Sequence, residues 1–273
     1  MIRALLRLFR PRLALLNAVS GLGGYLLYPA DVEWLGLWAA FLGVLLLAAA
    51  ASALNQVLES DLDSLMERTK QRPLPAGELT VRAATLLGAG GLLAGLVLLG
   101  AGGGSVAALL GALALLWYLA VYTPLKRRSS WSLAIGALCG ALPPVIGWSV
   151  AGGDILDFRI MLLAGLLYLW QIPHFWLFQR RHAEDYCRAG IPAVAAAMKG
   201  CSPANHFRLW IVALATAAML LPAFGIVGQT TGIWYAVFPL PLLLISLVSS
   251  EKALFSYLNM FPLLVTLALF LQR

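Results

Sequence analysis

The most charged stretch of this chain begins inside an apolar run and combines an amide with several carboxylates. Asn55, Glu59 and Asp63 follow one another at four-residue intervals, so a continuous helix would place them on one face, with Asp61 slightly aside. Carboxylates this close repel one another unless a cation lies among them. Mg²⁺ prefers such oxygen ligands and keeps positions free for water or substrate phosphates. The spacing therefore predicts a magnesium site at Asn55, Glu59, Asp61 and Asp63.

Basic residues follow the acidic ones directly. Arg68, Lys70 and Arg72 precede the sequence Pro73-Leu74-Pro75, which ends any helix. A divalent cation beside several fixed positive charges is suited to a diphosphate, so these residues are predicted to bind a phosphorylated substrate. The alternative is an ordinary solvated end of a membrane helix. An amide inside an apolar run favours the functional interpretation.

Composition places this stretch in a membrane protein. Of 273 residues, 61% are hydrophobic and only 11% are charged, and the mean hydropathy is +0.86. Soluble domains carry roughly 25% charged residues. The net charge of +7 would suggest nucleic acid in a soluble chain, but in a membrane protein the location of the charges decides their meaning. We therefore expect lipid and no nucleic acid as the surroundings.

Nine apolar segments approach the ~20 residues that cross a bilayer. The first, Leu13 to Tyr28, follows four arginines like a signal peptide, but its cleavage site is weak and eight apolar segments come after it, so an uncleaved helix is predicted. The others are predicted at 34–58, 81–99, 105–123, 132–150, 160–179, 207–227, 233–249 and 254–271. The expected fold is an all-α polytopic membrane protein. It would form a single domain over residues 1–273, a bundle with a central cavity open to the cytoplasmic side.

The basic residues predict the orientation. With the N-terminus inside, seventeen of the nineteen Lys and Arg residues fall on the cytoplasmic side, Lys126, Arg127 and Lys199 among them, and only Arg159 and Arg273 fall outside. We therefore predict a multi-pass protein of the cell (inner) membrane. Its N-terminus and the loops of the candidate site would face the cytoplasm.

A second polar segment leaves the membrane on the same side as the first. It runs from Gln179 to Tyr186 and contains Glu184 and Asp185. Two polar exits of similar character are predicted to face each other across the bundle. Asp185 would then contribute a ligand to the same magnesium site.

Three stretches resemble the signatures of a known family. The run NQVLESDLDSLMERTKQRPL, Asn55 to Leu74, resembles the first signature of the UbiA-type membrane prenyltransferases, and in particular of their protoheme IX farnesyltransferase (haem O synthase) branch. The run from Tyr122 to Trp148 resembles that branch's YTxxLKR…IG…GAxPPxxGW. The run from Trp170 to Pro192 resembles its WQxPHF…DYxxAGIP. The three stand in the right order and cover residues from about 10 to 195.

The resemblance implies transfer of a farnesyl group from farnesyl diphosphate to a vinyl group of haem b, giving haem O for respiratory oxidases, with Mg²⁺ as cofactor. It leaves room for contacts with other haem-pathway or oxidase-assembly proteins. The implied catalytic residues are Asn55, Glu59, Asp61, Asp63, Lys126 and Arg127. The implied substrate-binding residues are Arg68, Lys70, Arg72, Tyr122, Gln171, His174, Asp185 and Tyr186. Candidates to line a dry chamber around the allylic cation are Trp117, Tyr118, Tyr122, Trp148, Tyr168, Trp170, Phe175 and Trp176.

Two positions need separate treatment. Glu59 stands where the family pattern has Asp. The longer side chain would shift the metal or leave it to Asp61 and Asp63, and Glu59→Asp should be tolerated. His174 is expected in a cavity wall or in a structural role rather than as an axial haem ligand, because a lone His in such a run is more often a hydrogen-bonded structural residue and the haem must be released after the reaction.

Two other functions stay open at this point. A UbiA-type prenyltransferase acting on an aromatic acceptor, such as 4-hydroxybenzoate or another quinone precursor, would share the diphosphate site, but the runs MERTKQRPLP and WQIPHF…DYCRAGIP favour haem. A transporter or non-catalytic membrane binding protein would use the acids for a cation. Transporters often have broken helices at the bilayer midplane, whereas the polar residues here gather at one face.

Overall fold

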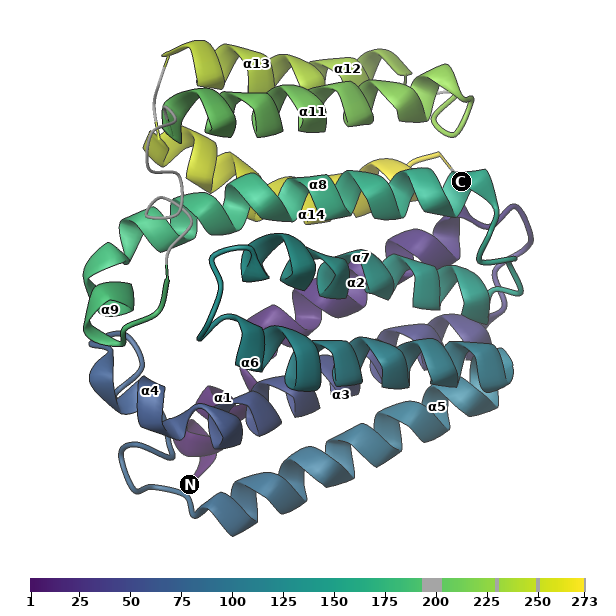
Figure 1. Ribbon diagram of the computed structural model, residues 1–273. Coiled ribbons are helices and arrows are strands. Elements are labelled where there is room, and N and C mark those ends of the chain that lie inside the picture. The colour runs from purple at the N-terminus through teal and green to yellow at the C-terminus, as the bar shows by residue number, and fades with distance from the viewer. Residues whose placement is uncertain (193–202, 229–230, 249–250, 273) are drawn as a thin grey trace.

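Helices make up all the regular structure in the part of the chain that the computed structural model describes, residues 1–192, 203–228, 231–248 and 251–272. Lys199, Arg273 and the end of the segment predicted at 233–249 lie outside these residues. In chain order the helices are α1 (Ile2–Phe9), α2 (Pro11–Leu27), α3 (Trp34–Leu58), α4 (Ser60–Leu65), α5 (Val81–Leu116), η1 (Trp117–Tyr122), α6 (Thr123–Leu125), α7 (Ser132–Val150), α8 (Phe158–Arg181), α9 (Ala183–Arg188), α11 (Pro203–Ala223), α12 (Thr231–Val237), α13 (Pro239–Val248) and α14 (Glu251–Phe270). Figure 1 shows the long helices lying side by side.

Six helices of the described residues are long and apolar enough to cross a membrane, against nine predicted segments. They are α3, the helix over 81–125, α7, α8, residues 206–223 of α11, and α14. The prediction of an all-α multi-pass membrane protein therefore agrees with the structure. The other predicted segments differ in length or continuity. The first, α2, has 17 residues, and the segment predicted at 233–249 is divided between α12 and α13.

Gly104 separates the two predicted segments, 81–99 and 105–123, within the helix over 81–125. Its backbone has φ 72° and ψ −171°, which is not helical and which glycine adopts without a Cβ clash. The chain folds back at this point. Gly111 consequently lies so close to Leu99 that an added Cβ would be 2.8 Å from Leu99 Cδ1. The two predicted segments are thus neighbouring helices joined at a glycine.

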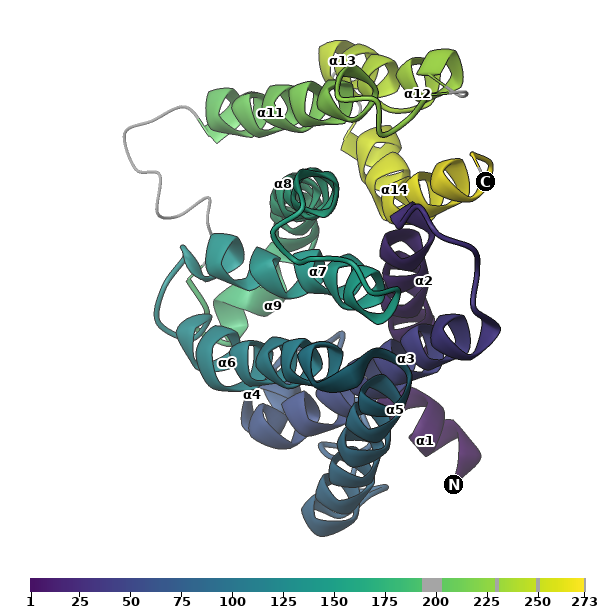
Figure 2. The ribbon, with the colours of Figure 1, turned by 90° about the vertical axis from the view of Figure 1, so that its right-hand side faces the viewer.

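Close backbone contact between α2 and α7 brings the middle of the bundle together. A Cβ at Gly24 would lie 1.8 Å from the carbonyl oxygen of Pro144, and a Cβ at Gly147 would lie 1.8 Å from that of Gly21. Only glycine permits this approach, which is how membrane helices gain contact area without a hydrophobic effect between them. Figure 2 shows α7 held between α8 and α6.

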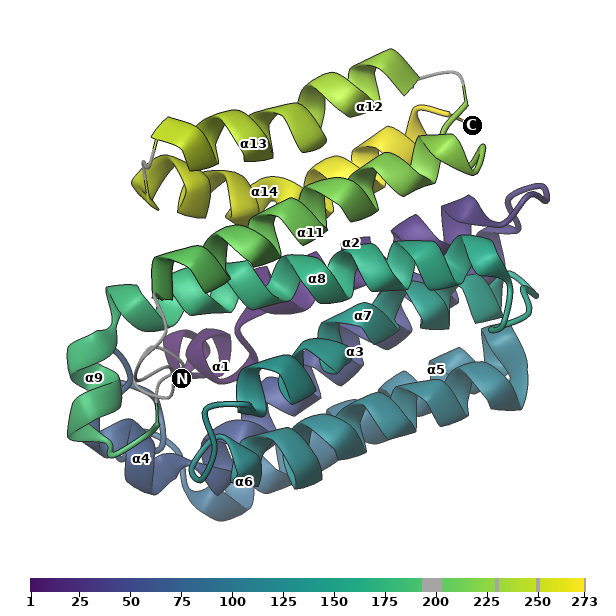
Figure 3. The ribbon, with the colours of Figure 1, turned by 45° about the horizontal axis from the view of Figure 1, so that its top comes forward.

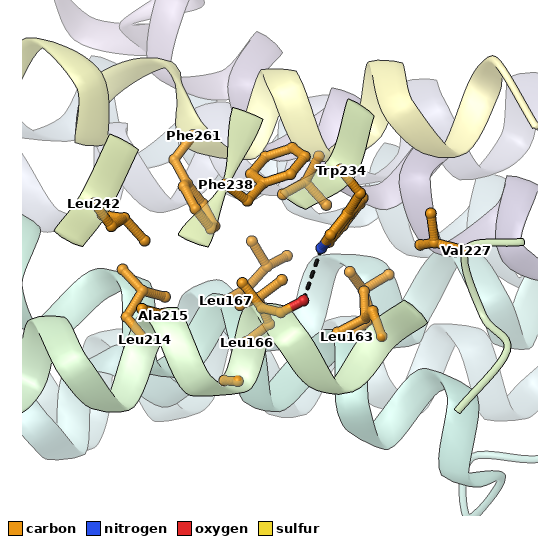
Figure 4. Packing of buried hydrophobic residues seen from close by; sticks show 14 of the residues in the cluster. Leu163, Leu166, Leu167, Leu214, Ala215, Val227, Trp234, Phe238, Leu242 and Phe261 are labelled. Carbon is orange, nitrogen blue, oxygen red and sulfur yellow. Dashed lines mark hydrogen bonds between the residues drawn. The ribbon is translucent and has the colours of Figure 1, made fainter. Parts of the chain in front are cut away.

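The helices that carry no sequence signature form a separate apolar core. Figure 3 shows α11, α12, α13 and α14 on the side of α8 away from α3 and α5, with α14 between α11 and the α12–α13 pair. Trp234 and Phe238 are almost completely buried there against α8 and α11, and the Trp234 indole donates a 2.7 Å hydrogen bond to the Ala218 carbonyl oxygen (Figure 4). This core supports α8 from behind and lies away from the acidic segment.

The polar segments gather at one end of the bundle. In Figure 1 the N-terminus, α4 and α9 lie at the same end, and the C-terminus lies at the other. The acidic segment around α4 and the second polar exit around α9 therefore share one end, as their sequence positions predicted.

Candidate active site

The acidic segment is not the continuous helix that its spacing predicted. α3 ends at Leu58, Glu59 has φ −121° and ψ 17°, and α4 begins at Ser60. The Asp63 N–H still donates to the Glu59 carbonyl oxygen at 2.8 Å, so helical hydrogen bonding continues past the break. Asn55, Glu59 and Asp63 are all buried, with 6%, 2% and 3% exposure, despite being polar.

Glu59 has one carboxylate oxygen satisfied and one free. Its Oε2 accepts hydrogen bonds from Asn55 Nδ2 at 2.9 Å and from Lys126 Nζ at 2.6 Å. Its Oε1 is buried and has no hydrogen-bond partner in the described part of the chain. A buried, unpaired carboxylate oxygen is energetically costly. Glu59 Oε1 is therefore available to bind a cation.

Thr123 holds the Asn55 amide in place. The Thr123 hydroxyl lies 3.0 Å from Asn55 Oδ1, where it can donate, and 2.8 Å from the Tyr118 carbonyl oxygen. Thr123 follows the π-helix η1, and its N–H also donates to the Tyr118 carbonyl oxygen, the i to i+5 pattern of that helix. Short π-helical segments often occur at functional sites. In the sequence, Thr123 is recognisable only as part of the YTxxLKR signature, and no role was predicted for it.

We expect Thr123→Val to weaken cation binding while leaving the fold intact, because valine has the same shape but cannot restrain Asn55. Loss of one such hydrogen bond should raise the Mg²⁺ concentration for half-maximal effect up to about tenfold. The Mg²⁺-dependent rise in melting temperature and the Mg²⁺ dependence of turnover both measure this. The matched control is Thr85→Val, since Thr85 donates to Val81 on the exposed side of α5. Equal Mg²⁺ dependence in both variants would contradict the role of Thr123.

Asp63 is bound by Arg72. Arg72 Nη1 donates to both Asp63 oxygens, at 2.8 and 2.6 Å. The Asp63 main-chain oxygen accepts from the buried Thr69 hydroxyl at 2.9 Å. Arg72, predicted to bind substrate, thus lies against an acid predicted to bind metal.

Asp61 points away from this buried group. Its side chain is 65% exposed, and both its oxygens accept from Arg127, at 2.8 and 2.9 Å. Arg127 also donates to the Leu58 carbonyl oxygen at 2.8 Å. Hydrogen bonding to Arg127 lowers the pKa of Asp61, and the same bond raises the pKa of Arg127. The pair braces the end of α3.

The five predicted metal ligands are not gathered around one point. Among the described residues, no group of three or more His, Cys, Asp or Glu side chains is close enough to hold a metal ion. The physical reason is local: the break at Glu59 and the Arg127 contact turn Asp61 outward, while Arg72 binds Asp63. Asn55 and Glu59 form the part of the predicted set that the structure brings together.

The two polar exits meet, as the sequence predicted. Asp185 Oδ1 accepts from the Glu67 N–H at 2.9 Å, and Oδ2 lies 3.3 Å from the Arg68 N–H. Asp185 is 7% exposed. These residues are more than a hundred positions apart in the chain, and Figure 1 shows α9 beside α4. Both carboxylate oxygens of Asp185 thus accept from backbone N–H groups of the loop after α4, and the metal role of Asp185 stays a prediction.

The other predicted residues of this end have varied surroundings. Lys70 is exposed and pairs with Glu67 at 2.5 Å. The Arg68 guanidinium lies 5.1 Å from the centre of the Phe178 ring. Burial raises the pKa of Tyr186.

Deeper in the bundle, predicted aromatic residues form two separate groups, one on η1 and one between α8 and α14. Tyr122 stacks on Tyr118 with ring centres 5.6 Å apart. His174 stacks between Trp170 at 5.0 Å and Phe255 at 5.6 Å, and its Nδ1 has no hydrogen-bond partner in the described residues. His174 is thus held between rings of α8 and α14, and its place in a cavity wall stays a prediction.

Three predicted lining or binding residues belong to helix packing. Gln171 Nε2 donates to the Ala137 carbonyl oxygen at 2.9 Å. Trp148 is fully buried and donates to the Asp154 carbonyl oxygen, and Trp176 packs in the core beside Phe207. Trp148 and Trp176 are thus in the protein interior, where hydropathy alone does not distinguish a core residue from a chamber wall.

A pocket of about 320 Å³ lies beside the acidic segment, lined by Arg7, Arg10, Arg68, Gln71 and Arg72. Arg7, Arg10 and Gln71 were missed as site residues. In the sequence, the N-terminal arginines indicate only the orientation of the chain in the membrane. Their contact with the loop after α4 depends on how α1 packs.

Comparison with known proteins agrees with the fold. The model of the UbiA prenyltransferase family matches residues 17–269. A protoheme IX farnesyltransferase of Geobacter sulfurreducens is 58% identical over 272 residues, covering the full length of both chains.

Two solved structures share the fold at low sequence identity. The apo UbiA homologue of Aeropyrum pernix K1 has a TM-score of 0.76 at 19% identity, with 95% of this chain and 96% of that chain covered. The UbiA homologue of Archaeoglobus fulgidus bound to DMAPP and Mg²⁺ has a TM-score of 0.72 at 16% identity, with 97% of both chains covered. The chain therefore belongs to the UbiA prenyltransferase family, within its protoheme IX farnesyltransferase branch.

Proposed function

We propose that this protein transfers the farnesyl group of farnesyl diphosphate to a vinyl group of haem b, giving haem O. The observation that carries the proposal is the full-length, 58% identity to a protoheme IX farnesyltransferase. The three sequence signatures favour the same acceptor over an aromatic quinone precursor. A transporter is disfavoured because the buried polar residues sit at one end of the bundle.

Asn55 and Glu59 are the residues that fit a magnesium ion. Glu59 offers a buried oxygen without a partner, and Asn55 Oδ1 keeps a second lone pair beside its bond to Thr123. One or two carboxylates are what Mg²⁺ takes from a protein when a phosphate supplies other ligands. When bound, Mg²⁺ would neutralise the charge that develops on the leaving diphosphate. Asp63 and Asp185 would join them only if Arg72 and the loop after α4 released their carboxylates.

Lys126 and Arg72 are the counter-charges closest to these acids. Both side chains are mostly buried. Lys126 pairs with Glu59, and Arg72 pairs with Asp63. A metal ion on the acids would weaken both pairs and free the two cations for phosphate oxygens. Such fixed charges stabilise a leaving diphosphate without reorganisation. Arg127 contributes indirectly, by holding Asp61 and the end of α3.

The aromatic group on η1 suits the second half of the reaction. The farnesyl C–O bond breaks and its electron pair leaves with the diphosphate. A vinyl carbon then forms the new C–C bond, and water adds to the resulting cation and loses a proton. Tyr118 and Tyr122 would line the path of the allylic cation and exclude water until the vinyl group has reacted, while Trp170 and His174 stack on each other along α8.

The finer topology also belongs to this proposal. The chain would act as one domain over residues 1–273, with nine membrane segments when α2, the two arms of α5 and the α12–α13 pair are included. The site would open to the cytoplasmic face of the inner membrane, because the basic residues gather at that end.

Mass analysis of haem extracted from membranes with and without the protein tests the proposal. The expected product is heavier than haem b by the elements of farnesol, since one farnesyl group and one hydroxyl are added. Parallel reactions offer 4-hydroxybenzoate as acceptor. A prenylated hydroxybenzoate with no haem product would overturn the haem proposal and favour the quinone-precursor alternative.

A further inference from the structure

The pocket lined by Arg7, Arg10, Arg68, Gln71 and Arg72, here called the arginine pocket, is built for an anion. Four arginines line it and no acidic residue is among its lining residues. Guanidinium groups bind carboxylates and phosphates through paired, charge-assisted hydrogen bonds. The arginine pocket therefore attracts a ligand with more than one negative oxygen.

Two of the four arginines are already neutralised. Arg7 pairs with both oxygens of Glu78 and donates to the Gln71 carbonyl oxygen at 2.6 Å. Arg72 pairs with Asp63. These two line the arginine pocket but have an acid in the protein.

Arg10 and Arg68 have no ion pair or side-chain hydrogen bond with any described residue. Partial desolvation lowers the pKa of both, and repulsion from Arg72 lowers it further. Arg10 is half-buried and Arg68 is exposed, and like charges held this close are unfavourable unless an anion joins them. The arginine pocket is thus short of negative charge at these two residues.

The backbone of Arg10 shows that this position favours another residue. Arg10 joins α1 to α2 with φ 48° and ψ 62°, and it is the one non-glycine residue with positive φ in the described chain. Glycine is the usual residue at such a helix end. A residue before proline is also normally extended, and Pro11 follows. A strained arginine at a glycine position indicates that its side chain is needed there.

A row of aromatic rings leads from the bundle to the arginine pocket. Along α8, Trp170 stacks on His174 at 5.0 Å, His174 contacts Phe175 at 5.1 Å, and Phe175 contacts Phe178 at 6.3 Å. The Arg68 guanidinium lies 5.1 Å from the centre of the Phe178 ring. A flat conjugated ligand that carries carboxylates matches both the row and its end.

We propose that Arg10 and Arg68 bind the propionate carboxylates of the haem acceptor. The proposal rests on the proposed function, which makes the acceptor a porphyrin with two carboxylates. A diphosphate binds together with Mg²⁺, and the lining of the arginine pocket has no carboxylate to hold that ion. An anion that binds without a metal therefore fits the arginine pocket better than a diphosphate does. A volume of about 320 Å³ suits propionate side chains, with the macrocycle against the rings of α8.

Arg10→Gly is the sharpest test, because glycine suits φ 48° and should preserve the helix junction. Purified protein is titrated with haem b and with its dimethyl ester by Soret absorbance, without farnesyl diphosphate. The wild type should bind haem b about ten- to a hundredfold more tightly than the ester. Arg10→Gly should lose that difference by weakening haem b alone, and the KM for farnesyl diphosphate should stay unchanged.

The matched control is Arg12→Gln, which removes an exposed charge two residues away, and it should retain the preference for haem b. Equal weakening of acid and ester in Arg10→Gly would show a structural role, and a rise only in the KM for farnesyl diphosphate would assign the arginine pocket to the diphosphate. Either result overturns the proposal, as does an unchanged preference. If the wild type forms no haem product, the proposed function fails, but the titration still tests the arginine pocket.

Discussion

Replacing Glu59 by Gln is expected to lower turnover at least about a hundredfold, the effect typical of removing one strong electrostatic contributor. Glutamine keeps the shape and can still accept from Asn55 and Lys126, but it removes the charge of a buried carboxylate that has a free oxygen. The Mg²⁺-dependent rise in melting temperature should disappear with the activity. Both quantities are measured on protein that inserts and purifies like the wild type.

Two further variants make the Glu59 result specific. Glu184→Gln removes a charge from the same end of the bundle, where its side chain is 90% exposed, and should leave both readouts near wild type. Glu59→Asp restores the family residue and should retain activity, because the charge and the oxygen ligands remain. Near-normal turnover in a well-expressed Glu59→Gln protein would remove Glu59 from the metal site. Inactive Glu59→Asp would show that the surroundings have adapted to the longer side chain.

Replacing Lys126 by Met is expected to produce two changes of opposite sign. The kcat/KM for farnesyl diphosphate should fall by about ten- to a hundredfold, because a charge-assisted contact to the diphosphate is lost. Mg²⁺ binding without diphosphate should become tighter, because Lys126 no longer competes for Glu59, 2.6 Å away. Methionine preserves most of the apolar stem, so packing should change little. Mg²⁺ titration by calorimetry and steady-state kinetics measure the two effects.

Arg128→Met is the matched control for Lys126. Arg128 lies two residues further on, is exposed, and carries the same charge in the same loop. Arg128→Met should therefore change neither the kcat/KM for farnesyl diphosphate nor Mg²⁺ binding, although it removes the same positive charge from the same side of the membrane. The affinity for haem should be unchanged in Lys126→Met, since a porphyrin has no diphosphate. Equal losses for farnesyl diphosphate and haem would instead favour a role of Lys126 in folding or topology.

Local properties of the chain determined much of this protein from the sequence alone. Hydropathy and segment length are summed over neighbouring residues, so they predicted the all-α membrane class. The residues that could bind a metal and a phosphate were also visible, because the type of a side chain determines whether it can bind a cation or an anion. The position of two polar segments at one end followed from counting crossings, and the contact of Asp185 with the loop after α4 agrees with it.

The tertiary structure decided which of these groups act together. Glu59 interrupts the predicted helix, and the spacing of Asn55, Glu59 and Asp63 could not show that Asp61 would turn outward to Arg127. The pairing of Glu59 with Lys126 and the placement of Arg10 beside Arg68 join residues far apart in the chain. Such contacts depend on how helices approach one another, at glycines such as Gly24 and Gly147, and no local pattern encodes that geometry. For this reason the sequence predicted the chemical groups of the site, while the packing selected their partners.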